Sequence, residues 1–488
     1  MNKHSSILHS SLCIVHCALC ILCCASAHGA AVDAMTTTPT VTMTSLSARQ
    51  RYPWNGKVDI DFSFTCDNPD AFAFIQFKAT YVNKAGVTCE LPMKTFDEVT
   101  IPWCTNAGTY HVTWDSCADT PGLQITNLTY TVTANMAKYM VVDLSKGTSA
   151  TADDPYPITY MEECPDPTRT DGGWTDEYRT TKMVFRLVQP GTYKKGWGTN
   201  VFTDWNCTPS YDVTLTRPFY LAIFECTQGQ AMQITGQYMG GSSYGFAKGP
   251  NRDKRPEGNV SYNAWRGKGT DGYCWPNHGS AVDPASIIGL FRIRTGNDGG
   301  FDMPTEAEWE YCARAGYTDA WGGDGLTTGQ GGTVATGPTS YNTNTLLTAR
   351  ARYKFNGGYI DDGTGKLTSP GYAYEGVDHG TAIVGSYEPN PWGFYDMQGN
   401  VRECTLDYFS SGNDRSDNID PMGKVVPPTV TKTNEVVRCG RGGHWDTNAR
   451  MCAFPTRNAG DAFKASYVIN GCRFAWHFPY APKLPPEE

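Results

Sequence analysis

Three side chains that can bind a metal or move a proton lie in one short segment of the chain: His444, Asp446 and Cys452. Imidazole, carboxylate and thiolate groups are all metal ligands in proteins. The segment could therefore hold a metal ion. After the first 27 residues, however, the chain has no C-x-x-C pair and no Cys/His cluster at zinc spacing. The alternative, which we favour, is a disulfide between Cys452 and either Cys439 or Cys472.

Other catalytic arrangements are missing from the sequence. It contains no Gly-x-Ser-x-Gly elbow, no phosphate-binding loop ending in Gly-Lys-Ser/Thr and no His-Glu-x-x-His helix. Histidines are few after the first 30 residues and follow no ligand spacing, so iron catalysis has no support. They are His111, His278, His379, His444 and His477.

Three helices with clear end signals would position the C-terminal half of the chain. Thr227–Gln230 and Thr305–Glu308 are both capping boxes, in which a threonine and a Gln or Glu three residues later satisfy each other's backbone N–H groups. Gly236 and Gly316 follow as stop signals. A third helix is expected after Asp283-Pro284, with Asp283 as its cap and a run of apolar residues before Gly296.

Residues 32–140 alternate apolar and polar positions in short runs such as Val58–Phe64 and Tyr110–Trp114. Such alternation, interrupted by turn residues, predicts an antiparallel all-β sandwich, and we expect an immunoglobulin-like module that acts as a spacer or interaction domain. Residues 141–180 have turn chemistry and few apolar anchors, which predicts a linker. A second domain is expected over 181–480, opened by a strand at Thr181–Val188, and a Pro-rich tail over 481–488.

Four phrases in that second domain resemble, in sequence and in order, the formylglycine-generating enzyme family, also called sulfatase-modifying factors. The phrases are Met303–Tyr311, Asn390–Val401, Arg441–Trp445 and Gly471–Phe474. The resemblance implies an α+β, loop-rich fold that is related to the C-type lectin fold. For this family it also implies copper-dependent oxidation of a sulfatase cysteine to formylglycine.

The resemblance breaks at the active site. Counted from Gly443, the family's first active cysteine falls at Thr447 and its second at Cys452, and His444 stands where the family commonly has serine. Two thiolates can hold a soft monovalent copper ion, whereas a threonine hydroxyl is a poor ligand for it. We therefore expect a non-catalytic binding or scaffolding member. The alternative is an oxidoreductase that acts on a sulfatase cysteine, or on another thiol, through Cys452 and His444.

A calcium site is implied by the same resemblance. The matching ligands are the side chains of Asp396 and Glu403 and the carbonyl groups of Gly399 and Val401. Calcium prefers hard oxygen ligands, and two carboxylates would neutralise its charge. The alternative is that Asp396 and Asn400 only shape a turn and that Glu403 is solvated.

Composition and targeting limit the partners. The net charge of −9 argues against nucleic acid. A ligand in a surface groove, namely a peptide, a protein or a glycan, is expected instead. Residues 1–27 are typical of a signal peptide, which predicts a protein that is secreted or held in the cell envelope or periplasm, with disulfides and with no transmembrane segment in the mature chain.

Overall fold

The computed structural model describes residues 39–52, 55–68, 71–98, 104–122, 127–136, 138–198, 207, 209–239, 251–267, 282–296, 299–322, 345–357, 360–361, 367–368, 380–409, 418–421, 437–461 and 470–478. The predicted signal peptide and Pro-rich tail lie outside these ranges. The chain divides into an N-terminal unit, Met1–Lys138 with Phe478–Glu488, and a C-terminal unit, Tyr139–His477. None of the described helices is long and apolar enough to cross a membrane.

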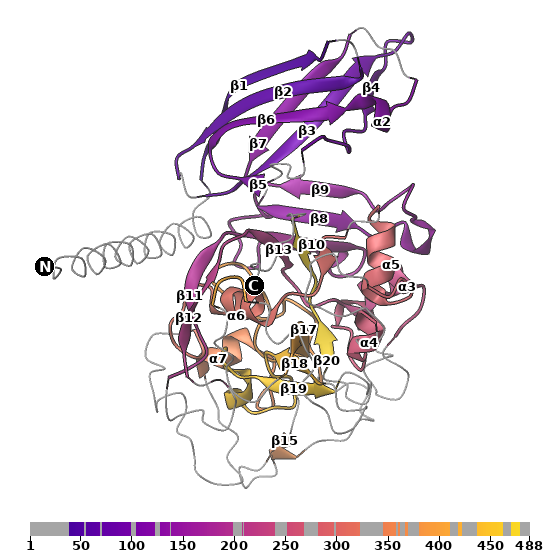
Figure 1. Cartoon of the computed structure of the whole chain (residues 1–488). Helices are drawn as coiled ribbons and strands as arrows, with labels where there is room; N and C mark the ends of the chain where they lie inside the picture. The colour runs from indigo at the N-terminus through magenta and orange to yellow at the C-terminus, as the bar shows by residue number, and fades with distance from the viewer. Residues whose placement is uncertain are drawn as a thin grey trace, which may run out of the picture. The chain divides into compact units, whose positions relative to one another are not determined.

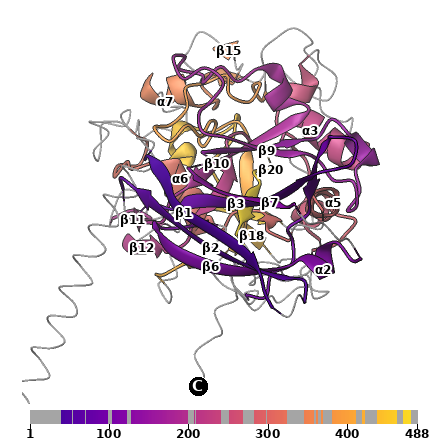
Figure 2. The same ribbon diagram turned by 90° about the horizontal axis from the view of Figure 1, so that it is seen from above.

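The N-terminal unit consists of two β-sheets and one short helix, α2 (Ser116–Asp119). Figure 1 shows both sheets, and Figure 2 shows β1, β2 and β6 side by side from above. The first sheet has the order β1-β2-β6; in the second, β3 pairs with β4, β5 and β7. The strands are β1 (Val41–Gln50), β2 (Lys57–Cys66), β3 (Ala73–Val82), β4 (Thr88–Leu91), β5 (Cys104–Thr105), β6 (Gly108–Asp115) and β7 (Thr129–Asn135).

One hydrophobic core joins the two sheets of this unit. It contains alternate residues of β2 and β6 from the first sheet and of β3 and β7 from the second, which is the pattern that alternation in the sequence predicts. Phe62 of β2 contacts Phe77 of β3 edge to face, with ring centroids 5.5 Å apart. The all-β content of this unit follows the expectation, and its likeness to an immunoglobulin module stays a prediction.

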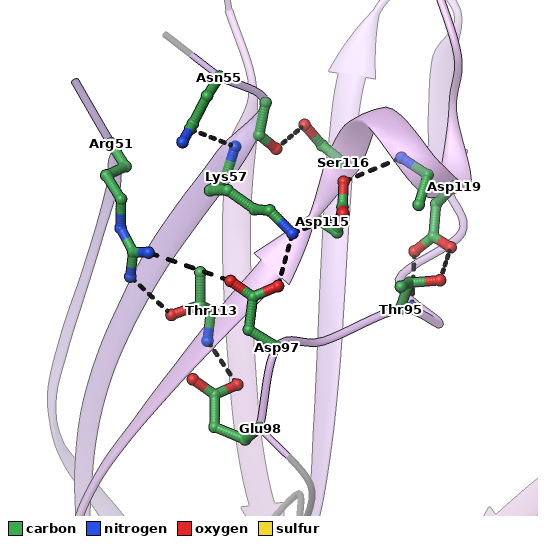
Figure 3. A network of polar contacts seen from close by, with 12 residues as sticks. Arg51, Asn55, Lys57, Thr95, Asp97, Glu98, Thr113, Asp115, Ser116 and Asp119 are labelled. Atoms are coloured by element: carbon green, nitrogen blue, oxygen red, sulfur yellow. Dashed lines mark hydrogen bonds and ion pairs between the residues drawn. The ribbon is translucent and has the colours of Figure 1, made fainter. Parts of the chain in front are cut away.

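A polar network closes one end of the first sheet (Figure 3). The Lys57 ammonium group donates to Asp97 Oδ1 at 2.5 Å and to Asp115 Oδ2 at 2.6 Å. Asp119 Oδ1 accepts from the Thr95 hydroxyl at 2.7 Å, and its Oδ2 accepts from the Trp114 indole at 2.8 Å. These bonds fix the segment around Thr95 and Asp97, between β4 and β5, and the helix α2 to the first sheet.

The C-terminal unit is built around a six-stranded antiparallel sheet with the order β14-β21-β13-β10-β8-β9. Figure 1 labels β13, β10, β8 and β9 of this sheet. A four-stranded sheet, β19-β18-β17-β20, and two hairpins complete the strands of the described part. In the four-stranded sheet, β17 pairs antiparallel with β18 and parallel with β20. The strands are β8 (Tyr139–Asp143), β9 (Ile158–Met161), β10 (Lys182–Val188), β11 (Gly191–Lys195), β12 (Tyr211–Leu215), β13 (Phe219–Ala222), β14 (Phe301–Asp302), β15 (Ile360–Asp361), β16 (Leu367–Thr368), β17 (Arg402–Tyr408), β18 (Val437–Arg441), β19 (Asn458–Asp461), β20 (Asn470–Cys472) and β21 (Ala475–His477).

The predicted linker at residues 141–180 is wrong. Strand β8 pairs with β10 in the register Met183 to Val142, and β9 extends the same sheet. Tyr139–Val142 are all buried, because β8 lies inside the sheet between β10 and β9. The segment is therefore part of the C-terminal unit, which begins about forty residues before the predicted boundary at 181.

Short helices surround the sheets: α3 (Gln228–Thr235), α4 (Tyr262–Trp265), α5 (Ile287–Arg294), α6 (Glu306–Arg314) and α7 (Thr345–Arg350). Both predicted capping boxes are confirmed, at Thr227 with Gln230 and at Thr305 with Glu308. Asp283 does not cap α5. Ser286 does so instead, and its hydroxyl accepts from Gly289 N at 3.1 Å, because Asp283 forms the preceding turn with Ser286.

Replacing the cap of α6 should lower stability measurably. Thr305 is buried; its hydroxyl accepts from Glu308 N at 3.1 Å, and Glu308 Oε2 accepts from Thr305 N at 2.8 Å. Thr305→Ala should reduce the free energy of unfolding by about 1–2 kcal/mol in urea titrations, because it leaves a backbone donor unsatisfied. Thr318→Ala, at an exposed position, is the matched control and should change it by less than about 0.5 kcal/mol.

A buried charge network surrounds the start of α6. Glu306 accepts from Arg457 through both carboxylate oxygens, and Lys195 lies 3.5 Å from one of them. Asp407 of β17 accepts from Glu306 N at 2.5 Å. Burial, and then the negative charge of Glu306, raise the pKa of Asp407 to about 7.

This pKa gives the C-terminal unit a testable pH dependence. Because the folded-state pKa of Asp407 lies above its unfolded-state value of 3.8, its contribution to stability is complete below about pH 4 and is lost as the pH rises toward 7. The free energy of unfolding should fall across this range by up to about 1.4 kcal/mol per pH unit from this group. Asp407→Asn should flatten the profile relative to the unaltered protein; parallel profiles would contradict the prediction.

Candidate functional site

The segment from His444 to Cys452 folds back on itself directly after β18. Gly442 and Gly443 both have positive φ angles, of 90° and 74°. A Cβ atom on Gly443 would lie 2.8 Å from Cys452 Sγ, so a larger residue would displace the thiol. Asn448 then caps a 3-10 helix, η6 (Ala449–Cys452), by accepting from Met451 N at 3.3 Å. The turn and the short helix together place the side chain of Cys452 next to that of Thr447.

Thr447 and Cys452, the two positions that the sequence resemblance singled out, lie side by side. Thr447 Oγ1 is 3.8 Å from Cys452 Sγ. The hydroxyl is already engaged, because it accepts from His444 N at 3.0 Å and donates to His444 O at 2.8 Å. Cys452 is fully buried beside Leu347, Ala351 and other apolar residues, and burial raises the pKa of its thiol to about 12.

This pair does not fit a copper ion. Linear coordination of monovalent copper needs two soft thiolates, and here a neutral thiol faces a hydroxyl that is bonded to the backbone. No reaction step through copper follows from the arrangement.

His444 is placed as a neutral side chain. Its Nδ1 accepts from Asp446 N at 3.2 Å. Burial, and then the positive charges of Arg402 and Lys354, lower the pKa of His444 to about 3, so the ring is uncharged at neutral pH. Asp446 faces Lys354 instead, with 3.4 Å between Oδ1 and Nζ.

The metal site considered for His444, Asp446 and Cys452 is therefore not formed. Within the described ranges, no group of three or more His, Cys, Asp or Glu side chains is arranged to hold a metal ion. The three residues point to different partners: Cys452 packs inward, while the Asp446 carboxylate turns toward Lys354.

The favoured disulfide of Cys452 is also wrong in this structure. Neither Cys439 nor Cys472 is bonded to Cys452. Cys439 lies on β18 and bonds to the Arg457 guanidinium, and Cys472 lies on β20 opposite Cys404. Cys452 is on η6 and directs its thiol toward Thr447 and Asn448 O.

The predicted calcium motif forms a tight turn before β17. Asp396, Gly399 and Asn400 have positive φ angles of 55°, 80° and 54°. A Cβ atom on Gly399 would lie 2.1 Å from Arg352 O, so the turn requires glycine there. Val401 directs its backbone N–H to Glu225 Oε1 at 3.0 Å.

The two predicted carboxylate ligands have different surroundings. Asp396 is buried; its Oδ2 accepts from Gly385 N at 2.6 Å, and its Oδ1 has no partner among the described residues. Burial raises the pKa of Asp396 to about 6. Both oxygens of Glu403 accept from Arg473, at 2.8 and 3.0 Å, and Oε2 also accepts from Trp309 Nε1 at 2.8 Å.

Glu225 completes this cluster, and sequence reasoning missed it. Its carboxylate accepts from Asn400 Nδ2 at 2.6 Å as well as from Val401 N. Burial, and then repulsion from Asp396 and Glu403, raise the pKa of Glu225 well above its usual range. A lone carboxylate in the apolar run Leu221–Cys226 was the available signal.

As arranged here, the donor set does not fit calcium. Asp396 offers one unpartnered oxygen, but Glu403 is occupied by Arg473 and Trp309. Arg473 supplies a positive charge among the three buried carboxylates, where a cation would otherwise be needed. Calcium binding stays a prediction from the sequence.

Comparison with known proteins shows one family. The family described as "Sulfatase-modifying factor enzyme 1-like domain" matches residues 174–477, which is more than half of the chain. A curated relative, the formylglycine-generating enzyme of Thermomonospora curvata, is 31% identical over 157 residues. The match covers 31% of this chain and 40% of that relative.

Solved structures with a similar fold have low sequence identity. Treponema denticola variable protein 1 is 21% identical, with a TM-score of 0.37, and the match covers 61% of this chain and 96% of that one. PvdO from Pseudomonas aeruginosa is 19% identical, with a TM-score of 0.41 and coverages of 60% and 94%. CarF is 18% identical, with a TM-score of 0.32 and coverages of 60% and 97%. At these scores the likenesses carry no argument about activity.

Proposed function

The chain belongs to the sulfatase-modifying factor enzyme 1-like family through residues 174–477, and from this premise we propose that it is a non-catalytic member that binds a ligand. The single observation that carries the proposal is the Thr447–Cys452 pair. The position of the family's first active cysteine is held by the Thr447 hydroxyl, which is bonded to His444, and the thiol at the second position, Cys452, is buried and protonated at neutral pH. Such a pair keeps the fold of the site without its copper chemistry.

The ligand proposed is a peptide, a protein or a glycan, and the N-terminal unit would act as a spacer or a second contact surface. Its core of alternating apolar residues and its closing polar network are suited to a stable spacer. Export, and with it an extracellular or cell-envelope location, is proposed from the signal-like sequence at residues 1–27.

A second candidate is an oxidoreductase that acts on a sulfatase cysteine or on another thiol. It is favoured by the retention of Cys452 at the matching position and by the activity for which the Thermomonospora curvata relative is named. Against it stand the missing thiol at position 447 and the high pKa of Cys452, because catalysis by cysteine requires the thiolate.

Mass spectrometry separates the two candidates. A cysteine peptide that carries a sulfatase motif would be incubated with the purified protein, copper(I) and oxygen, and its conversion to formylglycine followed by mass. We expect no conversion by the unaltered protein. Conversion above the protein-free control would overturn the proposal and establish the oxidoreductase.

A set of variants tests whether the missing thiol at position 447 is what prevents copper binding. Thr447→Cys should bind one copper(I) ion in competition with a chromogenic chelator, because it restores two thiols at the 3.8 Å contact. Thr447→Ser is the matched control and should bind none. The double variant Thr447→Cys/Cys452→Ser should also bind none; copper retained by it would show that other residues hold the ion.

A further inference from the structure

Three buried cysteines lie on adjacent extended segments of the C-terminal unit, away from the Thr447–Cys452 pair. Cys404 of β17 lies opposite Cys472 of β20 in a parallel register. On the other side of Cys472, Cys226 donates its backbone N–H to Cys472 O at 2.9 Å. All three are at most 6% exposed, and the structure holds each of them as a free thiol.

The strand register brings two of these cysteines within reach of a bond. Paired strands lie about 4.8 Å apart, and residues opposite each other direct their side chains to the same face of the sheet. The Cα atoms in a disulfide are usually about 4.4–6.8 Å apart, so an in-register pair meets this condition. Burial, and then the neighbouring Cys404 and Cys226, raise the pKa of Cys472, which agrees with the closeness of the thiols.

Cys226 is less suited to bond with Cys472. It is joined to Cys472 by one backbone hydrogen bond and is not its registered partner. The thiols of Cys226 and Cys472 each donate to the carbonyl of the next residue, at 3.8 and 3.4 Å, so the strand register is what separates Cys226 from Cys404. Cys226 therefore has nearly the same burial and neighbourhood as Cys404 without the same register, and it provides a matched control.

We propose that Cys404 and Cys472 form a redox pair that closes to a disulfide when the chain folds under oxidising conditions. One S–S bond forms, and the two thiols give up two protons and two electrons. A small disulfide, of which oxidised glutathione is the example, takes them up and is split into two thiols. The pairing goes beyond the proposed function and does not depend on it.

The position of this bond gives it a structural effect. Cys404 and Cys472 are the chain neighbours of Glu403 and Arg473, which form the buried ion pair described above. A disulfide between them would hold this pair together. It would also close a loop of about 70 residues that contains β18 and the Thr447–Cys452 segment, and long closed loops restrict the unfolded chain most.

Disulfide mapping tests the proposal. The full chain would be refolded in a buffer of reduced and oxidised glutathione, alkylated, digested without reduction and analysed by mass spectrometry. A cross-linked peptide pair with Cys404 and Cys472 is expected in the unaltered protein and in Cys226→Ser. It should be absent from Cys404→Ser.

Thermal melting provides a second measurement on the same samples. The oxidised form should melt about 6 °C above the reduced form in the unaltered protein and in Cys226→Ser. Cys404→Ser should show no such difference. If that variant does not fold, the mapping and melting of the unaltered protein and Cys226→Ser suffice.

Two results would overturn the proposal. One is alkylation of both Cys404 and Cys472 in the oxidised, folded protein. The other is linkage of Cys472 to Cys226 or to any other cysteine.

Discussion

Arg473→Met should lower the free energy of unfolding of the C-terminal unit by about 3–5 kcal/mol. Arg473 has no exposed surface. Its guanidinium binds both oxygens of Glu403 and also donates to Ala222 O at 2.9 Å and to Tyr395 O at 2.8 Å. Without it, the negative charge of Glu403 stays buried next to Glu225 and Asp396 with no ionic partner.

Equilibrium unfolding in urea would measure this loss. Two further variants would show whether it comes from the buried ion pair. Lys194→Met removes a lysine from an exposed ion pair with Asp212, with 61% and 67% of the two side chains accessible, and should change stability by less than about 1 kcal/mol. Arg473→Met combined with Glu403→Gln should recover part of the loss, because the charge of Glu403 is removed together with its partner. An Arg473→Met protein as stable as the Lys194→Met protein would show that the ion pair is not needed.

Trp114→Ala should destabilise the N-terminal unit by about 3–5 kcal/mol. Trp114 is completely buried in the core between the two sheets. Its indole N–H donates to Asp119 Oδ2 at 2.8 Å, and its ring meets Tyr130 edge to face, with centroids 6.4 Å apart. The substitution leaves a large cavity and removes one of the bonds that hold α2 to the sheet.

Limited proteolysis combined with urea titration would follow this change, since cleavage within residues 39–136 reports the opening of this unit. Tyr52→Ala is the control, because Tyr52 is 79% exposed and its truncation should cost less than about 0.5 kcal/mol. Equal protease resistance of the Trp114→Ala and unaltered proteins would contradict the prediction.

Features set by nearby residues could be predicted from the sequence. The capping boxes at Thr227 and Thr305 depend on contacts three residues apart, and both are found where expected. The strand predicted at Thr181–Val188 is β10, Lys182–Val188. The linker prediction failed because β8 is a five-residue strand whose partner, β10, lies some forty residues later, so the local pattern does not reveal the pairing.

In the candidate site, too, contacts between nearby residues could be predicted and contacts between distant residues could not. The resemblance placed Thr447 and Cys452 together, and the structure brings their side chains into contact. It could not indicate that Arg473 occupies Glu403 or that Glu225 binds Asn400, because these partners lie 70 and 175 residues apart in sequence. Nor could composition show that Cys452 is not bonded to Cys439 or Cys472, since disulfide connectivity depends on which strands become neighbours.

The place of β21 in the central sheet bears on how this chain folds as it is synthesised. Ala475–His477 lie between β13 and β14, and Phe219 pairs with His477. On a ribosome, β13 would emerge more than 200 residues before the strand that covers its edge. The edge of β13 would therefore stay unpaired while the rest of the unit is translated. During that time it could pair with strands of other nascent chains. Completion of the C-terminal unit is therefore a late event, and we expect a chaperone that shields strand edges to raise its yield.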